Sequence, residues 1–492
     1  MTGKEVLLVF PGAPERMPRA PFSVIVLASH IRRYGFKPRI LDTRVDDYRN
    51  FDFTKYLAIG LSVKTGEQLS SAVKVAKHIR KKTTAPIIWG GPHPSTYPQQ
   101  TCDSALADYV VIGEGEITFL ELLRALEKDE KSPQVSDIAG LVHKKDGITA
   151  RNGDRKFMDM EELDHPSYDL VDLKKYQDGL GMICVETSRG CPHRCSFCYV
   201  HDFHKRRWRK KSVKKVLGEL HYIAAKYGVD SFFICDDNFF TDKKRVLEIC
   251  TALIASGKGY KWFTQGRANY IASFTDEEMQ TLKKAGLEFI AIGAESGSQR
   301  LLDYIKKDIT VEEIINASRN CARAGIRPVL SFIVGIPNET EEDLRQTLDV
   351  YDRLKAISDD VEINGLYLFT TYPGTPIYQE AIKLGYREKQ TLEEWAAWKF
   401  SHPSNLTWLS PRDRNRLFTI SKIVLFQFLR DRFRSYGDEF RKQKIGRLKN
   451  LAWVVGSAIL SWDASFRWRH RYFHLAPEWK LFGLVTDIMK VT

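Results

Sequence analysis

The chain carries the stretch CPHRCSFC at residues 191–198, in which Cys191, Cys195 and Cys198 stand at a CxxxCxxC spacing. Three thiolates this close together can bind one inorganic cluster. Iron–sulfur cubanes are usually held by four cysteines, so a loop that offers three leaves one iron open to bind and reduce another molecule. The spacing therefore predicts an iron–sulfur cluster with three protein ligands.

Zinc is the main alternative for the metal of this loop. Structural zinc sites need four ligands, commonly paired CxxC units or cysteines with histidines. His193, His201 and His204 are near enough in the sequence to complete such a set. A zinc-bound nucleic-acid-binding module would also account for basic charge. It predicts that the basic residues gather near the cysteines, whereas most of the excess positive charge lies beyond residue 411. A disulfide framework fits poorly, because the remaining cysteines are scattered; they are Cys102, Cys184, Cys235, Cys250 and Cys321.

Length and composition are those of a folded protein with more than one domain. The 492 residues predict two or three domains, and 43% hydrophobic residues are enough for ordinary buried cores. The sequence shows no signal-peptide pattern, and no apolar run reaches the ~20 residues that a membrane span needs. We therefore expect a cytoplasmic location, where thiols stay reduced and an oxygen-sensitive cluster persists.

The net charge of +13 is concentrated toward the end of the chain, where residues 411–492 carry 17 Lys and Arg against 7 Asp and Glu. Basic tails favour nucleic acid or an anionic membrane surface. Here the basic residues alternate with aromatic ones and flank the apolar run from Leu451 to Trp462. This pattern favours peripheral membrane contact or a lipid-like, anionic small-molecule substrate over nucleic acid, which we do not expect as a partner. An ordinary core helix explains the apolar run equally well.

Residues 1–126 alternate short apolar strands with amphipathic helices, which predicts a Rossmann-like or flavodoxin-like parallel sheet. The predicted strands are Val6–Phe10, Arg39–Leu41, Leu57–Leu61, Ile87–Trp89 and Tyr109–Ile112, and the predicted helices lie near Phe22–Tyr34, Gly66–Lys82 and Thr118–Leu126. Ligands bind such sheets at the carboxyl ends of the strands. Gly90, Gly91, Gly113 and Gly115 stand at these ends and allow close approach of a ligand, although tight turns explain each glycine alone.

Strand and helix signals alternate again over residues 181–390. The predicted strands are Ile183–Thr187, Ser231–Cys235, Lys261–Gln265, Phe289–Ala294, Arg327–Val334 and Glu362–Phe369. Six such units predict a partial (β/α)6 TIM-type barrel, whose chemistry belongs at the C-terminal strand ends, and the cysteine loop follows the first strand. We expect residues 127–180 to form a connector with a hairpin near Leu141–Ala150, and residues 391–492 to form a basic, aromatic helical domain. The predicted fold class is therefore α/β with a C-terminal helical region.

Polar and small residues gather at the ends of the predicted barrel strands. The residues at these positions, which the family resemblance described below makes candidates for cofactor binding, are Phe197 in the cysteine loop, Asp236, Asp237 and Asn238 after the second strand, Gln265 and Arg267 at the third, Glu295 and Ser296 at the fourth, and Ser331 and Gly335 at the fifth. Packing is the competing explanation for Phe197, and helix capping for Asp237 or Asn238. Each of these signals is weak alone, but several of them in this order, downstream of the cysteines, form a specific pattern.

In their order along residues 1–390, these motifs resemble the radical S-adenosylmethionine (SAM) superfamily. The resemblance is to the subfamily with an N-terminal cobalamin-binding-type domain, which includes class B methylases and the anaerobic magnesium-protoporphyrin ester cyclase. It implies that a [4Fe-4S] cluster on the three cysteines cleaves SAM to a 5′-deoxyadenosyl radical. It also implies that Phe197 and the strand containing Ser331 lie near the adenine, and that Glu295 holds the ribose or the amino group of SAM. The segment from Asp236 to Asn238 is expected near the methionyl end.

One departure from this subfamily concerns cobalamin. Members that ligate cobalt through a protein histidine carry Asp-x-His-x-x-Gly after the first strand, whereas residues 11–19 here read PGAPERMPR and contain no histidine. The N-terminal domain therefore either binds cobalamin without a histidine lower ligand from the first loop, or holds only substrate or nothing. The first case predicts methylation of an unactivated carbon. The second predicts cobalamin-free cyclisation or rearrangement of a hydrophobic substrate.

Residues 205–211 read KRRWRKK, a dense positive run just after the cysteine loop. This run favours either neutralisation of a phosphate-bearing substrate or cofactor, or docking of an acidic electron donor such as flavodoxin or ferredoxin. A solvated helix cap with Ser212 as N-cap explains it as well. A non-catalytic, membrane-associated scaffold is a further interpretation of the whole chain, but it does not explain the ordered motifs at the strand ends.

Overall fold

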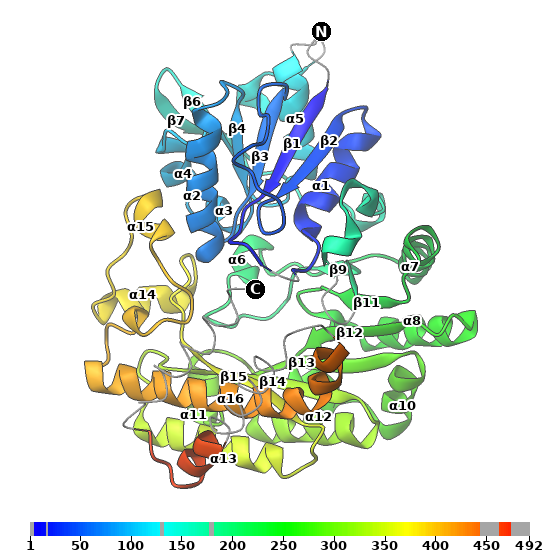
Figure 1. Cartoon of the computed structure of the whole chain (residues 1–492), viewed down its shortest axis with the longest axis vertical. Helices are drawn as coiled ribbons and strands as arrows, with labels where there is room; N and C mark the ends of the chain where they lie inside the picture. The colour runs from blue at the N-terminus through cyan, green and yellow to red at the C-terminus, as the bar shows by residue number, and fades with distance from the viewer. Residues whose placement is uncertain (1–3, 16–17, 128–131, 177–181, 443–461, 474–492) are drawn as a thin grey trace.

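The structure is a computed structural model that describes residues 4–15, 18–127, 132–176, 182–442 and 462–473. Figure 1 shows an N-terminal sheet domain, in blue and cyan, above a second layer of strands and helices in green and yellow. A largely parallel sheet, a fully parallel sheet and a helical C-terminal region confirm the predicted α/β fold class.

The first sheet contains seven strands in the order β2-β1-β3-β4-β5-β6-β7. The strands are β1 Glu5–Phe10, β2 Lys37–Asp42, β3 Ala58–Ser62, β4 Ile87–Gly90, β5 Tyr109–Val111, β6 Leu141–Lys145 and β7 Ile148–Arg151. Strands β1 to β5 pair in parallel in the flavodoxin-like order, and β6 and β7 add an antiparallel hairpin. The hairpin expected in the connector therefore extends the first sheet.

Helices cover both faces of this sheet. The helices are α1 Phe22–Arg33, α2 Glu67–Arg80 and α5 Glu116–Glu127, with the short α3 Pro92–Thr96 and α4 Pro98–Asp103 after β4. Val6 and Leu8 of β1 share a core with α1 and α5, whereas Leu7 and Val9 share one with α2. Alternate side chains of a strand point to opposite faces, so a continuous apolar run such as β1 is buried on both sides.

The second sheet has six parallel strands in the order β8-β11-β12-β13-β14-β15, as predicted for a partial barrel. The strands are β8 Ile183–Val185, β11 Ser231–Ile234, β12 Lys261–Gly266, β13 Leu287–Glu295, β14 Arg327–Val334 and β15 Glu362–Leu368. The connecting helices are α7 Val213–Tyr227, α8 Lys243–Ser256, α9 Ala268–Ala272, α10 Asp276–Lys284, α11 Gln299–Tyr304, α12 Val311–Arg323 and α13 Glu341–Lys355. Two short strands, β9 Ser188–Arg189 and β10 Arg209–Lys210, pair antiparallel around the cysteine loop.

The predicted strands lie within a few residues of the observed ones, and two differences have a physical cause. The first barrel strand, predicted to reach Thr187, ends at Val185 because the Thr187 N–H and hydroxyl donate to Asp236 (2.6 and 2.5 Å). Strand β13 continues to Glu295, with a bulge in its pairing between Gly293 and Glu295. Both differences arise where the chain leaves regular pairing next to the cysteine loop and its neighbours.

Segments after the barrel pack against both halves of the molecule. Helix α14 Pro376–Lys383 is followed by α15 Leu392–Ala396, which contacts α2 and buries Trp395, while α16 Pro411–Lys442 lies along β15. Farther on, the Trp468 ring packs on Tyr351, and Arg471 donates to Asp352 (2.6 Å) on α13. Apart from Trp462, the apolar run from residue 451 lies outside the described residues. Within the described part of the chain, no helix is long and apolar enough to cross a membrane.

Candidate active site

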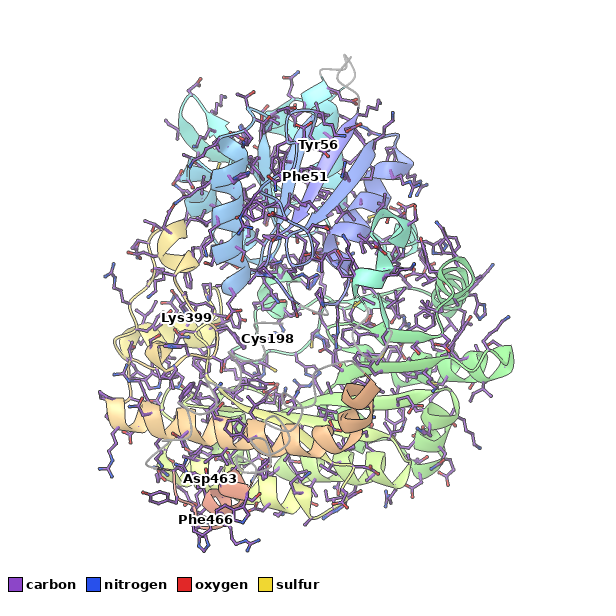
Figure 2. All side chains as sticks on the ribbon, viewed as in Figure 1. Phe51, Tyr56, Cys198, Lys399, Asp463 and Phe466 are labelled. Carbon is purple, nitrogen blue, oxygen red and sulfur yellow. The ribbon has the colours of Figure 1, made fainter. Side chains whose placement is uncertain are left out.

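The cysteine loop follows β9 and lies between the N-terminal sheet and the barrel strands, as the label of Cys198 in Figure 2 shows. Gly190 opens the loop with φ of 85°, and a Cβ there would collide with backbone. The Ser196 N–H donates to the Ile305 carbonyl (2.8 Å), and the Ser196 carbonyl accepts from the Ile377 N–H (3.1 Å). These bonds fix the loop at the carboxyl ends of the barrel strands.

The three thiols sit in a partly desolvated setting with polar neighbours. Cys195 is 7% exposed and accepts a hydrogen bond from Arg267 Nη1 (3.1 Å), and Asn238 Nδ2 lies 3.9 Å from the Cys191 sulfur. Burial raises the pKa of Cys198 to about 12, and the adjacent Cys195 and Cys191 add to that rise. In the described part of the chain, no three His, Cys, Asp or Glu side chains converge on one metal ion. A cubane needs no such convergence, because each cysteine binds a different iron, so the donor set fits a cluster with three protein ligands.

Of the two aspartates after β11, only Asp237 faces the loop's surroundings. Asp236 is 1% exposed, and its carboxylate accepts from the Thr187 N–H and from the hydroxyls of Thr187 and Ser188 (2.6, 2.5 and 2.6 Å). It therefore fixes the chain between β8 and β9, and we do not include it among the proposed cofactor ligands. The Asp237 carboxylate accepts from the Gly190 N–H (2.8 Å) and lies 3.5 Å from His204 Nε2.

A second group of predicted residues surrounds Lys307. Its ammonium donates to Glu295 Oε1 (2.8 Å), and both side chains are about nine-tenths buried, at 7% and 10% exposure. The same ammonium lies 5.7 Å from the centre of the Phe197 ring, and the Lys307 carbonyl accepts from Arg267 Nη2. Glu295 has φ of 66°, a left-handed conformation that is uncommon for a residue with a side chain and is often found at functional sites. A Cβ on Gly293 would clash with the Glu295 carboxylate, so this glycine makes the pair's geometry feasible.

The remaining predicted residues differ in how exposed they are at the strand ends. Gln265 is exposed at the end of β12, Ser331 is half-buried in β14, and Gly335 follows β14 with φ of 80°. Ser296 is fully buried, and its hydroxyl bonds with the Thr347 hydroxyl of α13 (3.2 Å). Because that oxygen bonds inside the protein, we also omit Ser296 from the proposed ligand set.

The carboxyl ends of β4 and β5 open into a cavity of about 250 Å³ between the two domains. Gly90, Gly91, Gly113 and Gly115 all line it, so the structure brings together the four glycines that the sequence singled out. Gly91 has φ of 97°, and a Cβ there would lie 2.8 Å from the Val63 carbonyl oxygen. The walls are largely apolar, and the side that faces the barrel is formed by residues near the cysteine loop.

That side of the cavity is held by an ionic cluster of Glu114, Arg189, Arg209 and His204, which we call the Glu114 clamp. Arg209 Nη1 donates to Glu114 (3.1 Å), and Arg189 Nη1 and His204 Nδ1 lie 3.6 and 3.5 Å from its oxygens. Arg189 also donates to Glu116 (2.8 Å). Burial opposes ionisation of Glu114, but His204 and the two arginines outweigh it and lower its pKa to about 2. The clamp thus joins the N-terminal sheet to the cysteine-loop region.

Lys307, Glu114, Arg189 and Arg209 were not singled out in the sequence, and His204 was considered only as a zinc ligand, whereas the structure places it beside Glu114 and Asp237. The sequence shows that Glu114 lies beside Gly113 and Gly115 and that Arg209 lies in the basic run, but it does not show that these two residues pair. Arg189 precedes the cysteines by two residues and is 8% exposed, a burial that predicts a charged partner. No local pattern indicates Lys307, which follows α11 and reaches Glu295 only through the fold.

Comparison with known proteins agrees with this arrangement. Residues 185–351 match the radical SAM superfamily, and residues 20–123 match the B12 binding domain. An uncharacterized methyltransferase of Pyrococcus horikoshii is 31% identical over 395 residues, which cover 77% of this chain and 83% of that protein. The anaerobic magnesium-protoporphyrin IX monomethyl ester cyclase of Cereibacter sphaeroides is 30% identical over 300 residues, 60% of this chain but only 48% of the cyclase.

A solved structure has the same fold. The radical SAM methyltransferase TsrM of Kitasatospora setae, determined with cobalamin and a [4Fe-4S] cluster bound, superposes with a TM-score of 0.63 at 21% identity, over 78% of this chain and 76% of that one. The two matching domains, the extent of the Pyrococcus relative and the shared architecture lead to one conclusion. The chain is an enzyme that belongs to the radical SAM superfamily, among the members with an N-terminal B12-binding domain.

Proposed function

We propose that this enzyme uses a [4Fe-4S] cluster on Cys191, Cys195 and Cys198 to cleave SAM, and that it methylates an unactivated carbon of a small molecule with the help of cobalamin. The observation that carries the proposal is the position of the glycine-lined cavity. It lies at the carboxyl ends of the first sheet and is joined through the Glu114 clamp to the cysteine loop. Both cofactors would thus be held at one interface between the domains.

The cluster supplies the electron for SAM cleavage when it is bound, and the residues around it have separate tasks. Arg267 donates toward the Cys195 sulfur (3.1 Å) and would stabilise the negative charge of the thiolate. Asn238 Oδ1 is buried and has no hydrogen-bond partner among the described residues, so it is an acceptor available to the amino group of SAM. The pair of Glu295 and Lys307 offers one charge of each sign for the amino and carboxylate groups of SAM.

The glycines along this cavity support binding of part of a corrinoid there. Gly60 in the middle of β3 also lines the cavity, and a Cβ there would lie 2.9 Å from a Leu8 methyl group, so a larger residue would disturb the packing beside the cavity. At Gly113 a Cβ would meet no atom within 4 Å, so the glycine leaves open space at the cavity edge. Since residues 11–19 contain no histidine, we propose that any cobalamin bound here lacks a lower ligand from that loop.

The proposed reaction sets requirements outside the site. Reduction of the cluster needs a one-electron donor, for which we propose a flavodoxin or a ferredoxin. An oxygen-sensitive cluster favours the cytoplasm. Peripheral membrane contact through the basic, aromatic C-terminal region stays a prediction, because most of that region lies outside the described residues.

Anaerobic reconstitution tests the proposal. The protein is purified with hydroxocobalamin present, supplied with iron and sulfide, reduced with dithionite and incubated with SAM. We expect about four irons per chain, about one corrinoid per chain and formation of 5′-deoxyadenosine. Loss of 5′-deoxyadenosine formation in Cys198→Ala, with an unchanged circular dichroism spectrum, would tie the activity to the loop. Stoichiometric zinc would contradict the cluster assignment. Corrinoid occupancy below a few per cent would replace methylation by cobalamin-free cyclisation or rearrangement.

A further inference from the structure

The structure gives the cations of the basic run at residues 205–211 different surroundings. Four of its cations are committed to internal partners: Arg206 donates to the Pro192 carbonyl (3.2 Å), Arg209 to Glu114 (3.1 Å), Lys210 to Asp242 (2.6 Å) and the buried Lys211 to Glu219 (2.7 Å). Ser212 is the N-cap of α7, as expected, since its hydroxyl accepts from the Lys215 N–H (3.2 Å), but the internal bonds mean that the run as a whole is neither a solvated cap nor a uniform docking patch. Lys205 and Arg207 both line a cavity, and Lys205 also interacts with another group of the protein.

This second cavity, of about 530 Å³, lies beside the glycine-lined one and shares Gly113, Glu114 and Phe203 with it. Its cationic lining consists of Arg151, Arg155, Lys156, Lys205 and Arg207, against the two acidic residues Asp154 and Glu114. Both carboxylates are already neutralised, Asp154 by Arg151 (2.7 Å) and Glu114 by the clamp. Arg155 pairs with Glu121.

Arg151, Arg155 and Lys205 thus interact with other groups of the protein, and Lys156 and Arg207 are the cations of this lining that the proposal uses. Both side chains are exposed at the cavity, and no carboxylate of the described residues lies within ion-pair distance of either. Two positive charges from separate segments, without a carboxylate among the described residues beside them, line one cavity and favour binding of an anion, since charge-assisted hydrogen bonds to phosphate or carboxylate are stronger than neutral ones. The cavity is lined as well by the rings of Phe157, Tyr199 and Phe203, which offer apolar surface next to the charges.

We propose that this cavity binds the anionic group, a phosphate or a carboxylate, of the methyl acceptor, with Arg207 and Lys156 as its principal ligands. The proposal rests on the proposed function and names its substrate class: a small molecule with an anionic group next to an apolar or planar part. Tyr199 directly follows Cys198, and Glu114 borders both cavities, so a molecule anchored here extends toward the interface that holds both cofactor sites. Arg207 and Lys156 act as positioning residues, because they bind the anionic group of the substrate and do not contact its reacting carbon.

Calorimetric titration of the full-length protein with inorganic pyrophosphate, and separately with glutarate as a dicarboxylate, tests the site. The site variant is Lys156→Gln/Arg207→Gln. The control is Lys244→Gln/Arg345→Gln, which removes the same charge from side chains that are 88% and 62% exposed on α8 and α13. We expect one saturable site for at least one of the two anions, with a Kd that rises about tenfold or more in the site variant and less than about twofold in the control. Which anion binds identifies phosphate or carboxylate as the recognised group.

Three results would overturn the proposal. The first is no saturable binding of either anion to the wild type. The second is the same Kd in the site variant and the control, which would reflect only the net charge of the protein. The third is loss of hydroxocobalamin binding in the site variant with anion binding retained, which would assign the charges to the phosphodiester of the corrinoid. The titrations need neither cofactor, so their outcome is independent of the reconstitution experiment that tests the proposed function.

Discussion

Replacing Glu114 by glutamine should weaken the contact between the two domains. The Glu114 side chain is 9% exposed, and those of its partners Arg189 and Arg209 are 10% and 18% exposed. Removing one member of a buried ion pair typically costs ~3–5 kcal/mol, because the other charge stays buried. The pKa of Glu114, lowered from 4.5 to about 2, gives a similar figure: at ~1.36 kcal/mol per unit it corresponds to roughly 3 kcal/mol.

Hydrogen–deuterium exchange of the strand pair beside the clamp measures this effect. Arg209 lies in β10, which pairs with β9, and the Lys211 N–H donates to the Thr187 carbonyl (2.9 Å). If opening of this region becomes easier by roughly 3 kcal/mol, exchange of these amides should accelerate about a hundredfold at constant pH. Glu341→Gln is the matched control, because that side chain is 70% exposed in its pair with Arg416 and such surface pairs contribute ~0–1 kcal/mol.

The reasoning would be refuted by exchange within about threefold of the wild-type rate in the Glu114→Gln protein. Arg209 retains the Met158 carbonyl as an acceptor (3.0 Å), and Arg189 retains Glu116 and Glu186 (2.8 Å each). Unchanged exchange would mean that these partners hold the interface without Glu114. Equal acceleration in the control would mean that the measurement reports global stability.

Other variants separate structural from functional roles. Glu295→Ala should raise the Kd for SAM about tenfold with an unchanged cluster spectrum, since a carboxylate that binds an ammonium group is lost; unchanged affinity would remove Glu295 from the site. Asp236→Ala should lower the thermal midpoint by several degrees, because three buried donors lose their acceptor, and a normal midpoint with weakened SAM binding would reverse its assignment. The depressed pKa of Glu114 means that its contribution is complete above pH ~4.5 and is lost as the pH falls toward 2. The difference in thermal midpoint between wild type and Glu114→Gln should therefore shrink from pH 6 to pH 3.5, and a constant difference would contradict the linkage.

The strands and their order along the chain were largely predictable, because apolar runs with turn residues between them encode local structure. The bulge that places Glu295 in a left-handed conformation was not, since it depends on the space that Gly293 leaves beside it. Asp236 shows a different limit. Its sequence context, an acidic residue after an apolar strand, is the same for a ligand and for a structural acceptor. Only the donors from Thr187 and Ser188, nearly fifty residues away, decide between the two roles.

Charges are the features that sequence patterns describe least well. The run at residues 205–211 looks uniform, yet the buried Lys211 stabilises α7 through Glu219 while Arg207 faces a cavity. The partners come from separate elements, so the local pattern could not separate these roles. The same holds for Arg189 and Glu116, which pair across the two domains from 73 residues apart.

The arrangement of the two sheets also explains how one interface could hold the two proposed cofactors. In each parallel sheet the ligand-binding loops follow the carboxyl ends of the strands. Here Gly91 and Gly113 after β4 and β5 line a cavity together with Glu186 and Arg189, which follow β8 of the barrel. The carboxyl edges of both sheets therefore meet, and the Glu114 clamp fixes the distance between them. A change that loosens the clamp should impair both SAM cleavage and corrinoid retention, whereas a change confined to the cysteine loop should impair SAM cleavage alone.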